Sequence, residues 1–332
     1  MPKIYLIGEK LSQHPFTMPI QASIQEVEEL MRLQAHDRHP ELQAAFDHLI
    51  VAGGKRVRPA LVLLTGNMLG AEHDRLVTTA AAVEMLHTAT LVHDDLIDGA
   101  LLRRGNPTLN SHWSPAATVL TGDFIFARAA KLAANTDCLP LMKLFAETLA
   151  IIVNGELTQL FSSRGVANRE NYDQRIYAKT ASLFEMSARA AAMISPVEQV
   201  IVEKMQEFGR NIGMAFQILD DILDFTGEQE FVGKPVGSDL LQGLITLPTL
   251  HYIEKYPDDK NVAILLDGNF STHPTAMAEL VQSVRSSECI KLTLKDARSL
   301  VEDVINILKD MPAGEERLAL EELAWYIVDR NI

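Results

Sequence analysis

The chain has 332 residues, of which 47% are hydrophobic, enough for a substantial buried core. Its net charge of −14 argues against a nucleic-acid partner, which would require a basic surface. Cys138 and Cys289 lack the spacing of zinc or redox motifs and predict no disulfide framework. The apolar runs fall short of the roughly 18 residues of a membrane span. With no recognisable signal peptide, we expect a cytoplasmic protein without a transmembrane segment.

Hydrophobic residues recur with the 3.6-residue period of an α-helix, and strict alternation is nearly absent. We therefore expect an all-α fold without strands and, since no boundary is visible, a single domain over residues 1–332. A capping box at Ser23-Ile24-Gln25-Glu26 predicts the start of the first helix, and Gly70 and Gly99 predict two helix ends. The predicted helices cover residues 23–36, a segment from 41, then 60–69, 76–98, 116–134, 139–161, 172–193, 198–225, 245–256, 275–284, 292–309 and 314–328.

Two aspartate clusters of one design lie in predicted helices, at residues 93–98 and 219–224. Positions i, i+1 and i+4 share one side of a helix, where like-charged pairs repel by about a few tenths of a kcal/mol. Hard oxygen ligands in this number suit Mg²⁺, which takes one or two carboxylates, waters and substrate phosphates. We therefore expect more than one Mg²⁺ ion to bridge a diphosphate between the clusters. The candidate ligands are Asp94, Asp95, Asp98, Asp220, Asp221 and Asp224.

Basic residues gather at a few places in this otherwise acidic chain. They are Lys55, Arg56 and Arg58 beside the glycine pair of segment 53–59, then Arg103, Arg104, Lys179 and Lys234. Arginine binds phosphate oxygens in pairs, and a glycine pair lets the backbone approach a ligand closely. These cations predict a site for two anions, one held through metal and one directly. The alternative is that they only neutralise the aspartates.

Two polar side chains lie on the same helix faces as the clusters. His87 precedes Asp94 by two helical turns, and Gln217 precedes Asp221 by one. Both are candidates for substrate contact, although a lone buried histidine is also a common core residue.

In order and spacing, these segments resemble the signature set of the trans-isoprenyl (polyprenyl) diphosphate synthase family. The matching segments are Gly-Gly-Lys-Arg-Val-Arg-Pro at 53–59, Leu-Val-His-Asp-Asp-Leu-Ile-Asp at 91–98, Arg-Arg-Gly at 103–105, Tyr-Ala-Lys-Thr-Ala at 177–181, Phe-Gln-Ile-Leu-Asp-Asp-Ile-Leu-Asp at 216–224 and Gly-Lys-Pro-Val-Gly-Ser-Asp-Leu at 233–240. The resemblance implies long antiparallel helices around a central cavity, usually in a homodimer. It also implies that isopentenyl diphosphate is added head to tail to an allylic diphosphate, which ionises with the help of Mg²⁺.

The resemblance also assigns roles to individual residues. The six aspartates would hold Mg²⁺ around the allylic diphosphate. Isopentenyl diphosphate would contact Lys55, Arg58, His87 and Arg104. The allylic side would comprise Arg103, Lys179 and Lys234, with Thr180 and Gln217 beside the reacting carbons. One segment departs from the family pattern. Residues 243–248 resemble a stretch that usually reads Gly-Lys-x-Thr-Leu-Pro, and Leu244 replaces the lysine, so one phosphate-side cation is missing.

Product length follows from the side chains before the first cluster, which in this family form the upper wall of the product cavity. Ala89 and Thr90 are small, and Met85 and Leu86 are flexible, so the open wall could run roughly 18 Å along the helix. We therefore expect a long-chain product, C30 or longer, of the kind used for quinone side chains. The alternative is that the small residues only permit close helix packing.

Several other functions stay open at the level of sequence. A shorter-chain farnesyl or geranylgeranyl synthase would use the same motifs. A class I terpene cyclase would have no use for the second diphosphate site. A subunit of a heteromeric synthase, or a small accessory subunit beside a catalytic homodimer, would be consistent with Leu244. Release of a long apolar product could also involve transient membrane contact.

Overall fold

The computed structural model describes residues 14–36, 39–51, 54–103, 105–161, 168–227 and 236–329. Within them the fold is helical apart from one short hairpin, so the predicted all-α class is confirmed. The N-terminal half contains η2 (Pro15–Ile20), α1 (Gln21–Leu33), α2 (Pro40–Val51), α3 (Val57–Met68), α4 (His73–Ile97), β1 (Leu102–Arg103), β2 (Asn106–Pro107), η3 (Leu109–Ser111), α5 (Pro115–Ala134) and α6 (Leu139–Phe161). The C-terminal half contains α7 (Arg169–Ile176), η4 (Tyr177–Ala181), α8 (Ser182–Met193), α9 (Gln199–Thr226), α11 (Ser238–Leu241), α12 (Leu247–Lys255), α13 (Lys260–Leu266), η5 (Phe270–Thr272), α14 (Pro274–Ser286), α15 (Cys289–Lys309) and α16 (Glu315–Asp329).

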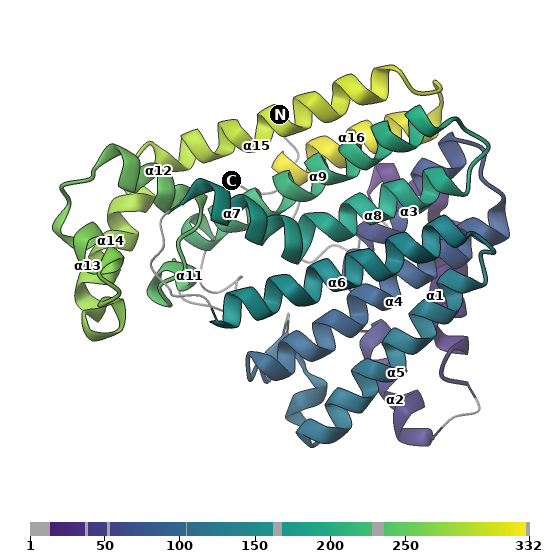
Figure 1. The fold of residues 1–332 in the computed structure, drawn as a ribbon, viewed down its shortest axis with the longest axis horizontal. Helices are drawn as coiled ribbons and strands as arrows, with labels where there is room; N and C mark the ends of the chain where they lie inside the picture. Colours follow the sequence, from purple (N-terminus) through teal and green to yellow (C-terminus); the bar gives the residue numbers. More distant parts are fainter. Residues whose placement is uncertain are drawn as a thin grey trace.

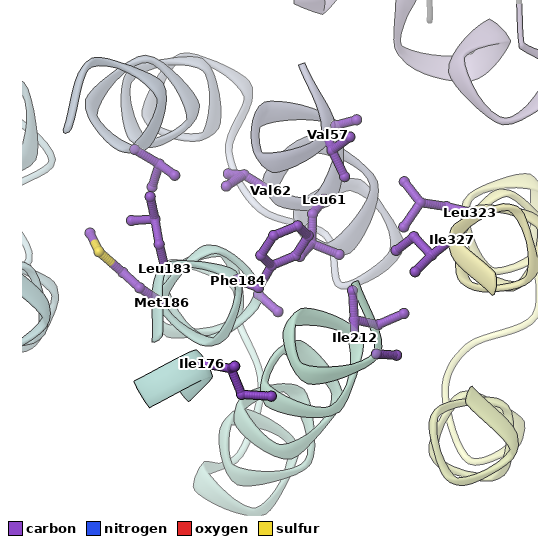
Figure 2. Packing of buried hydrophobic residues seen from close by; sticks show 14 of the residues in the cluster. Val57, Leu61, Val62, Ile176, Leu183, Phe184, Met186, Ile212, Leu323 and Ile327 are labelled. Atoms are coloured by element: carbon purple, nitrogen blue, oxygen red, sulfur yellow. The ribbon is translucent and has the colours of Figure 1, made fainter. Parts of the chain in front are cut away.

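The long helices pack side by side (Figure 1). Helices α4 and α9 carry the two aspartate clusters. Helix α4 packs on α5, α8 packs on α9, and α3 contacts both α4 and α8. The side chains between them form a continuous apolar core. Figure 2 shows Phe184 of α8 beside Leu61 of α3, with Ile212 of α9 and Leu323 of α16 close by. A cavity between the helices stays a prediction.

Glycine allows α9 to approach the preceding helical segment closely. A Cβ atom on Gly213 would lie 2.5 Å from Cα of Ala181, and one on Gly209 would lie 2.6 Å from the Phe184 carbonyl oxygen. Atoms cannot approach that closely without a shift of the backbone, so only glycine permits this spacing. The close approach fixes the second aspartate cluster against the segment that carries Thr180.

Three local predictions differ from the structure, and two short helices were not predicted. The capping box is wrong: η2 already makes the chain helical before Gln21, and Ser23 is buried inside α1 rather than capping it. The helix predicted over 172–193 is divided, because the five residues of η4 form a π-helical turn between α7 and α8. The expected absence of strands is wrong at β1 and β2, which pair antiparallel. The short helices α11 and α13 were not predicted, since four and seven residues are too few for a periodic signal.

Helix α6 exposes apolar side chains. Val153, Leu157, Leu160 and Phe161 follow each other at helical spacing and are 46–85% exposed; we call them the α6 apolar stripe. By length and composition α6 could also cross a membrane, a test that core helices of soluble proteins pass too, and 22% of its most apolar window is buried. The predicted lack of a transmembrane segment therefore stays a prediction.

Candidate active site

The first aspartate cluster lies at the C-terminal end of α4, where each carboxylate has a different setting. Asp95 is buried and forms an ion pair with Arg103, whose Nε lies 2.8 Å from the carboxylate. Asp94 is half-buried, and burial raises its pKa to about 6 although Lys179 acts in the opposite direction. Asp98 is exposed and forms the C-cap of α4. The cluster thus holds Asp95 through Arg103 and leaves Asp94 and Asp98 more accessible.

Lys179 connects the first cluster to the π turn η4. Its Nζ lies 3.0 Å from the Glu156 carboxylate of α6. Burial lowers the pKa of Lys179, but Glu156, Asp94 and Asp98 outweigh that effect and raise it above its ordinary value. The lysine therefore stays charged, with the first cluster and α6 around it.

The second cluster is linked to the same turn through a chain of hydrogen bonds. Thr180 donates to Oε1 of Gln217 at 2.7 Å, and the Gln217 amide donates to Asp221 at 3.0 Å. The buried Tyr172 hydroxyl donates to the other Asp221 oxygen at 2.7 Å. Burial raises the pKa of Asp221 to about 7, and these two hydrogen bonds oppose that rise. Lys179 thus acts on the first cluster, and Thr180, the next residue of the π turn, is linked to the second.

Asp220 and Asp224 differ from Asp221 in their surroundings. Asp224 accepts hydrogen bonds from the Ser238 hydroxyl at 2.7 Å, the Ser238 amide at 3.1 Å and the Asp239 amide at 3.2 Å. It therefore anchors the start of α11 to the end of α9. Asp220 is half-buried beside Asp221. The six predicted ligands are thus chemically unequal in this structure.

The predicted contacts for a second diphosphate meet where α3 begins. Nη1 of Arg58 lies 3.0 Å from Nε2 of His87 on α4, and the Arg58 guanidinium stands 4.7 Å from the Phe184 ring centroid. Lys55 donates to the Tyr326 hydroxyl of α16 at 2.9 Å. Because His87 precedes Asp94 by two turns, this group lies about 10 Å along α4 from the first cluster.

Between Lys55 and Arg58, the side chain of Arg56 is 10% exposed and turns toward the protein. It forms ion pairs with Glu84 at 2.8 Å and Glu28 at 3.0 Å, and donates to the Ile50 carbonyl at 2.9 Å. Its backbone has φ of 49°, in the left-handed region that non-glycine residues seldom adopt. Arg56 therefore joins α1, α2 and α4 to the start of α3, where Lys55 and Arg58 also lie.

Two predicted cations, Arg104 and Lys234, lie outside the described residues. Among the predicted wall residues, Met85, Leu86 and Ala89 are at most 1% exposed. Thr90 is half-buried and donates its hydroxyl to the His87 carbonyl at 2.7 Å.

The donor set fits a metal that completes its shell with substrate oxygens. Among the described residues, no three Asp, Glu, His or Cys side chains form a ready-made metal cage. Mg²⁺ does not need one, since it is usually held by one or two carboxylates, waters and phosphates. Both clusters lie in the last turns of long helices, α4 and α9, where the helix dipole adds further negative charge. A cation between them would therefore be strongly favoured.

Sequence reasoning missed Glu156 and Tyr172, which bond directly to predicted site residues. It also grouped Arg56 with the cations expected to bind phosphate, whereas the structure pairs it with Glu28 and Glu84. Glu156 gave a weak signal, as a carboxylate in an otherwise apolar helix. Tyr172 gave none, because a tyrosine before Lys179 is compatible with any amphipathic helix.

Comparison with known proteins identifies the family to which the chain is similar. Residues 39–284 match the family model described as polyprenyl synthetase. The chain is 36% identical over 305 residues to the heptaprenyl diphosphate synthase component 2 of Geobacillus stearothermophilus, covering 92% of this chain and 94% of the relative. The structure resembles the heptaprenyl diphosphate synthase of Staphylococcus aureus, with TM-score 0.88, 32% identity and coverage of 94% and 99% of the two chains.

A second similar structure contains ligands. The polyprenyl synthase of Caulobacter crescentus, solved with calcium and isoprenyl diphosphate, gives TM-score 0.87 at 34% identity and coverage of 96% and 98%. The matched residues include both aspartate clusters and the turn between them. The chain therefore belongs to the polyprenyl synthetase family, as a prenyltransferase of the long-chain polyprenyl diphosphate synthase type.

Proposed function

We propose that this chain adds isopentenyl diphosphate repeatedly to an allylic diphosphate and releases a product of C30 or longer, of the kind used for quinone side chains. The observation that carries the proposal is the π turn between the clusters. It brings Lys179 beside Asp94 and links Thr180 through Gln217 to Asp221. A diphosphate between the clusters would meet cations and carboxylates from separate helices.

We propose different tasks for the six aspartates. Asp94, Asp98 and Asp220, which are half-buried or exposed, would contact Mg²⁺. Asp95, Asp221 and Asp224 accept hydrogen bonds from protein groups and would hold their neighbours in place. Mg²⁺, when bound, would neutralise charge that develops on the departing pyrophosphate. The solved Caulobacter relative, with calcium and isoprenyl diphosphate, supports a divalent metal beside the substrate.

Different residues of the chain would bind the two substrates. Arg103 and Lys179 would bind the allylic diphosphate, together with Lys234, and the cleaved C–O bond would leave an allylic cation near Thr180 and Gln217. Lys55, Arg58 and His87, with Arg104, would hold isopentenyl diphosphate so that its double bond attacks that cation. The proton lost after condensation can pass to the departing pyrophosphate, so a separate base is unnecessary. Thr180 is 7% exposed, so its surroundings would help to keep water from the cation.

The test is incubation of the purified chain with labelled isopentenyl diphosphate, Mg²⁺ and a series of allylic primers, followed by sizing of the products. We expect products of C30 or longer from the chain alone. Absence of elongation with every primer would contradict the proposal, and products that stop at C15 or C20 would favour a shorter-chain synthase.

A second candidate is the catalytic component of a heteromeric synthase, favoured by the name of the Geobacillus relative as component 2. We rank it below a homodimer because the α6 apolar stripe offers a surface for a second copy of the chain. Elongation that begins only when a second protein is added would reverse this order.

A cytoplasmic location and transient membrane contact at product release remain part of the proposal.

A further inference from the structure

The segment around Leu244 is tied to the second aspartate cluster. The Leu244 amide donates to the Asp239 carbonyl at 2.9 Å, and the Asp239 amide donates to Asp224 at 3.2 Å. Position 244, which carries leucine instead of the related segment's lysine, is therefore two hydrogen bonds away from Asp224. A basic side chain in this region would act on an anion held at the second cluster.

Another cation occupies this region. Nη2 of Arg175 on α7 donates to the Ile245 carbonyl at 2.6 Å, directly after Leu244 in the chain. The same guanidinium stands 5.6 Å from the ring centroid of Tyr172, the residue whose hydroxyl bonds Asp221. The positive charge of Arg175 lowers the pKa of Asp221, although burial outweighs it, whereas Arg169, on the same helix, forms ion pairs with Asp173 and Asp296.

The backbone beside Arg175 also suits an anion. Thr246 is the N-cap of α12, but its side chain makes no capping hydrogen bond. Its hydroxyl is buried, and the residue is 3% exposed, with no hydrogen-bond partner among the described residues. The N-terminus of a helix carries partial positive charge and unpaired amides. Arg175 therefore contacts the residue that follows position 244, and the unpartnered Thr246 hydroxyl, at the N-cap of α12, lies two residues after that position.

We propose that Arg175 binds the diphosphate of the allylic substrate, and the pyrophosphate that leaves it, and thereby replaces the missing cation at position 244. This inference rests on the proposed function. Arg175 would approach the anion from α7, so the charge comes from a different element than the lysine of the related segment. The bond to the Ile245 carbonyl holds the guanidinium in that region before substrate arrives.

The test compares inorganic pyrophosphate binding, measured by isothermal titration calorimetry in excess Mg²⁺, in the wild type and three variants. Arg175→Gln should weaken binding by about tenfold, the loss expected for one charge-assisted hydrogen bond. It should raise KM for the allylic diphosphate and leave KM for isopentenyl diphosphate unchanged. Arg169→Gln, which removes the same charge from the same helix, should behave as the wild type. Leu244→Lys added to Arg175→Gln should restore pyrophosphate affinity.

The restored variant separates binding from a structural role, because a lysine at 244 cannot replace the bond to the Ile245 carbonyl. Unchanged pyrophosphate affinity in Arg175→Gln, or a loss that Leu244→Lys does not restore, would overturn the inference while wild-type elongation still supports the proposed function. Should Arg175→Gln fail to fold by circular dichroism, Leu244→Lys alone should tighten pyrophosphate binding. Unchanged affinity in that variant would overturn the inference as well.

Discussion

Arg56 stabilises the start of α3 through a buried ion network. Glu84 is 4% exposed, and an unpaired carboxylate at such a site is costly. Burial lowers the pKa of Arg56, but Glu84 and Glu28 together raise it above its ordinary value, so the guanidinium stays charged. The strained backbone at φ 49° is thus maintained by contacts to three other helices. Lys55 and Arg58 flank this anchored residue in the chain.

We expect Arg56→Met to lower the free energy of unfolding by about 3–5 kcal/mol, because it leaves Glu84 buried without a counterion. Urea denaturation followed by circular dichroism measures this change. Arg298→Met is the matched control: Arg298 is half-exposed and forms an ion pair with Asp329 at 3.3 Å, so its loss should cost about 1 kcal/mol or less. Equal losses in the two variants would show that the buried network contributes no special stability.

The π turn η4 is positioned by close contact with α6. A Cβ atom on Gly155 would lie 2.6 Å from Cβ of Ala178, whereas its next contacts would be 3.7 Å away or more. Gly155 precedes Glu156, the partner of Lys179, and Ala178 precedes Lys179 itself. The spacing of α6 and η4 therefore sets the position of the lysine.

We expect Gly155→Ala to slow elongation and to lower the free energy of unfolding by about 1–3 kcal/mol, the usual range for overpacking. Adding Ala178→Gly removes the clashing methyl group and should recover most of the elongation rate, though glycine within a helix costs about 1 kcal/mol of its own. Elongation rates and thermal unfolding of the single and double variants measure the effect. A double variant as slow as Gly155→Ala would argue against packing at this contact as the cause.

Helix α4 carries the proposed wall of the product cavity. Replacing Ala89 with Ser, Leu and Phe should shorten the product in proportion to side-chain volume, because each larger group would block growth nearer the first cluster. The measurement is chromatographic sizing of products from a fixed primer. Slower synthesis of unchanged long products across the series would instead support the alternative in which Ala89 only permits close helix packing.

At the scale of the whole molecule, the α6 apolar stripe is the surface on which we expect a second copy to dock. Leu157→Asp should convert a dimer to a monomer in analytical ultracentrifugation, since a desolvated charge opposes association. Leu318→Asp is the control: Leu318 is 55% exposed on α16 and lies outside the stripe. A dimer that withstands Leu157→Asp would place the interface elsewhere.

The sequence predicted the helices well because their apolar period is long and strong. The bounds of α6 agree at both ends, and α4 and α9 differ by a few residues. The π turn could not be predicted, because α7 before it has only eight residues, too few to show a shift in the phase of the hydrophobic period. The helix start predicted at Ser23 was wrong because a capping box reflects only local sequence, whereas the preceding helical turn depends on tertiary packing.

The chemistry of the site was more predictable than its geometry. Residue type and order identified the aspartates and most of the cations, but not their partners in the fold. The ion pairs of Arg56 and the hydrogen bond of Tyr172 join residues 28 and 49 positions apart in the chain. No periodic signal encodes such a pairing.

The π turn also determines which side chains of its own helix can act together. Tyr172 and Thr180 are eight residues apart, and at about 100° per residue an uninterrupted α-helix would separate them by roughly 80° around its axis. A π turn absorbs one residue, which reduces the separation to roughly 20° on the same count. Tyr172 can then bond Asp221 while Thr180 bonds Gln217, one turn apart on α9. A single inserted residue thus aligns two side chains that α-helical geometry alone would direct toward different neighbours.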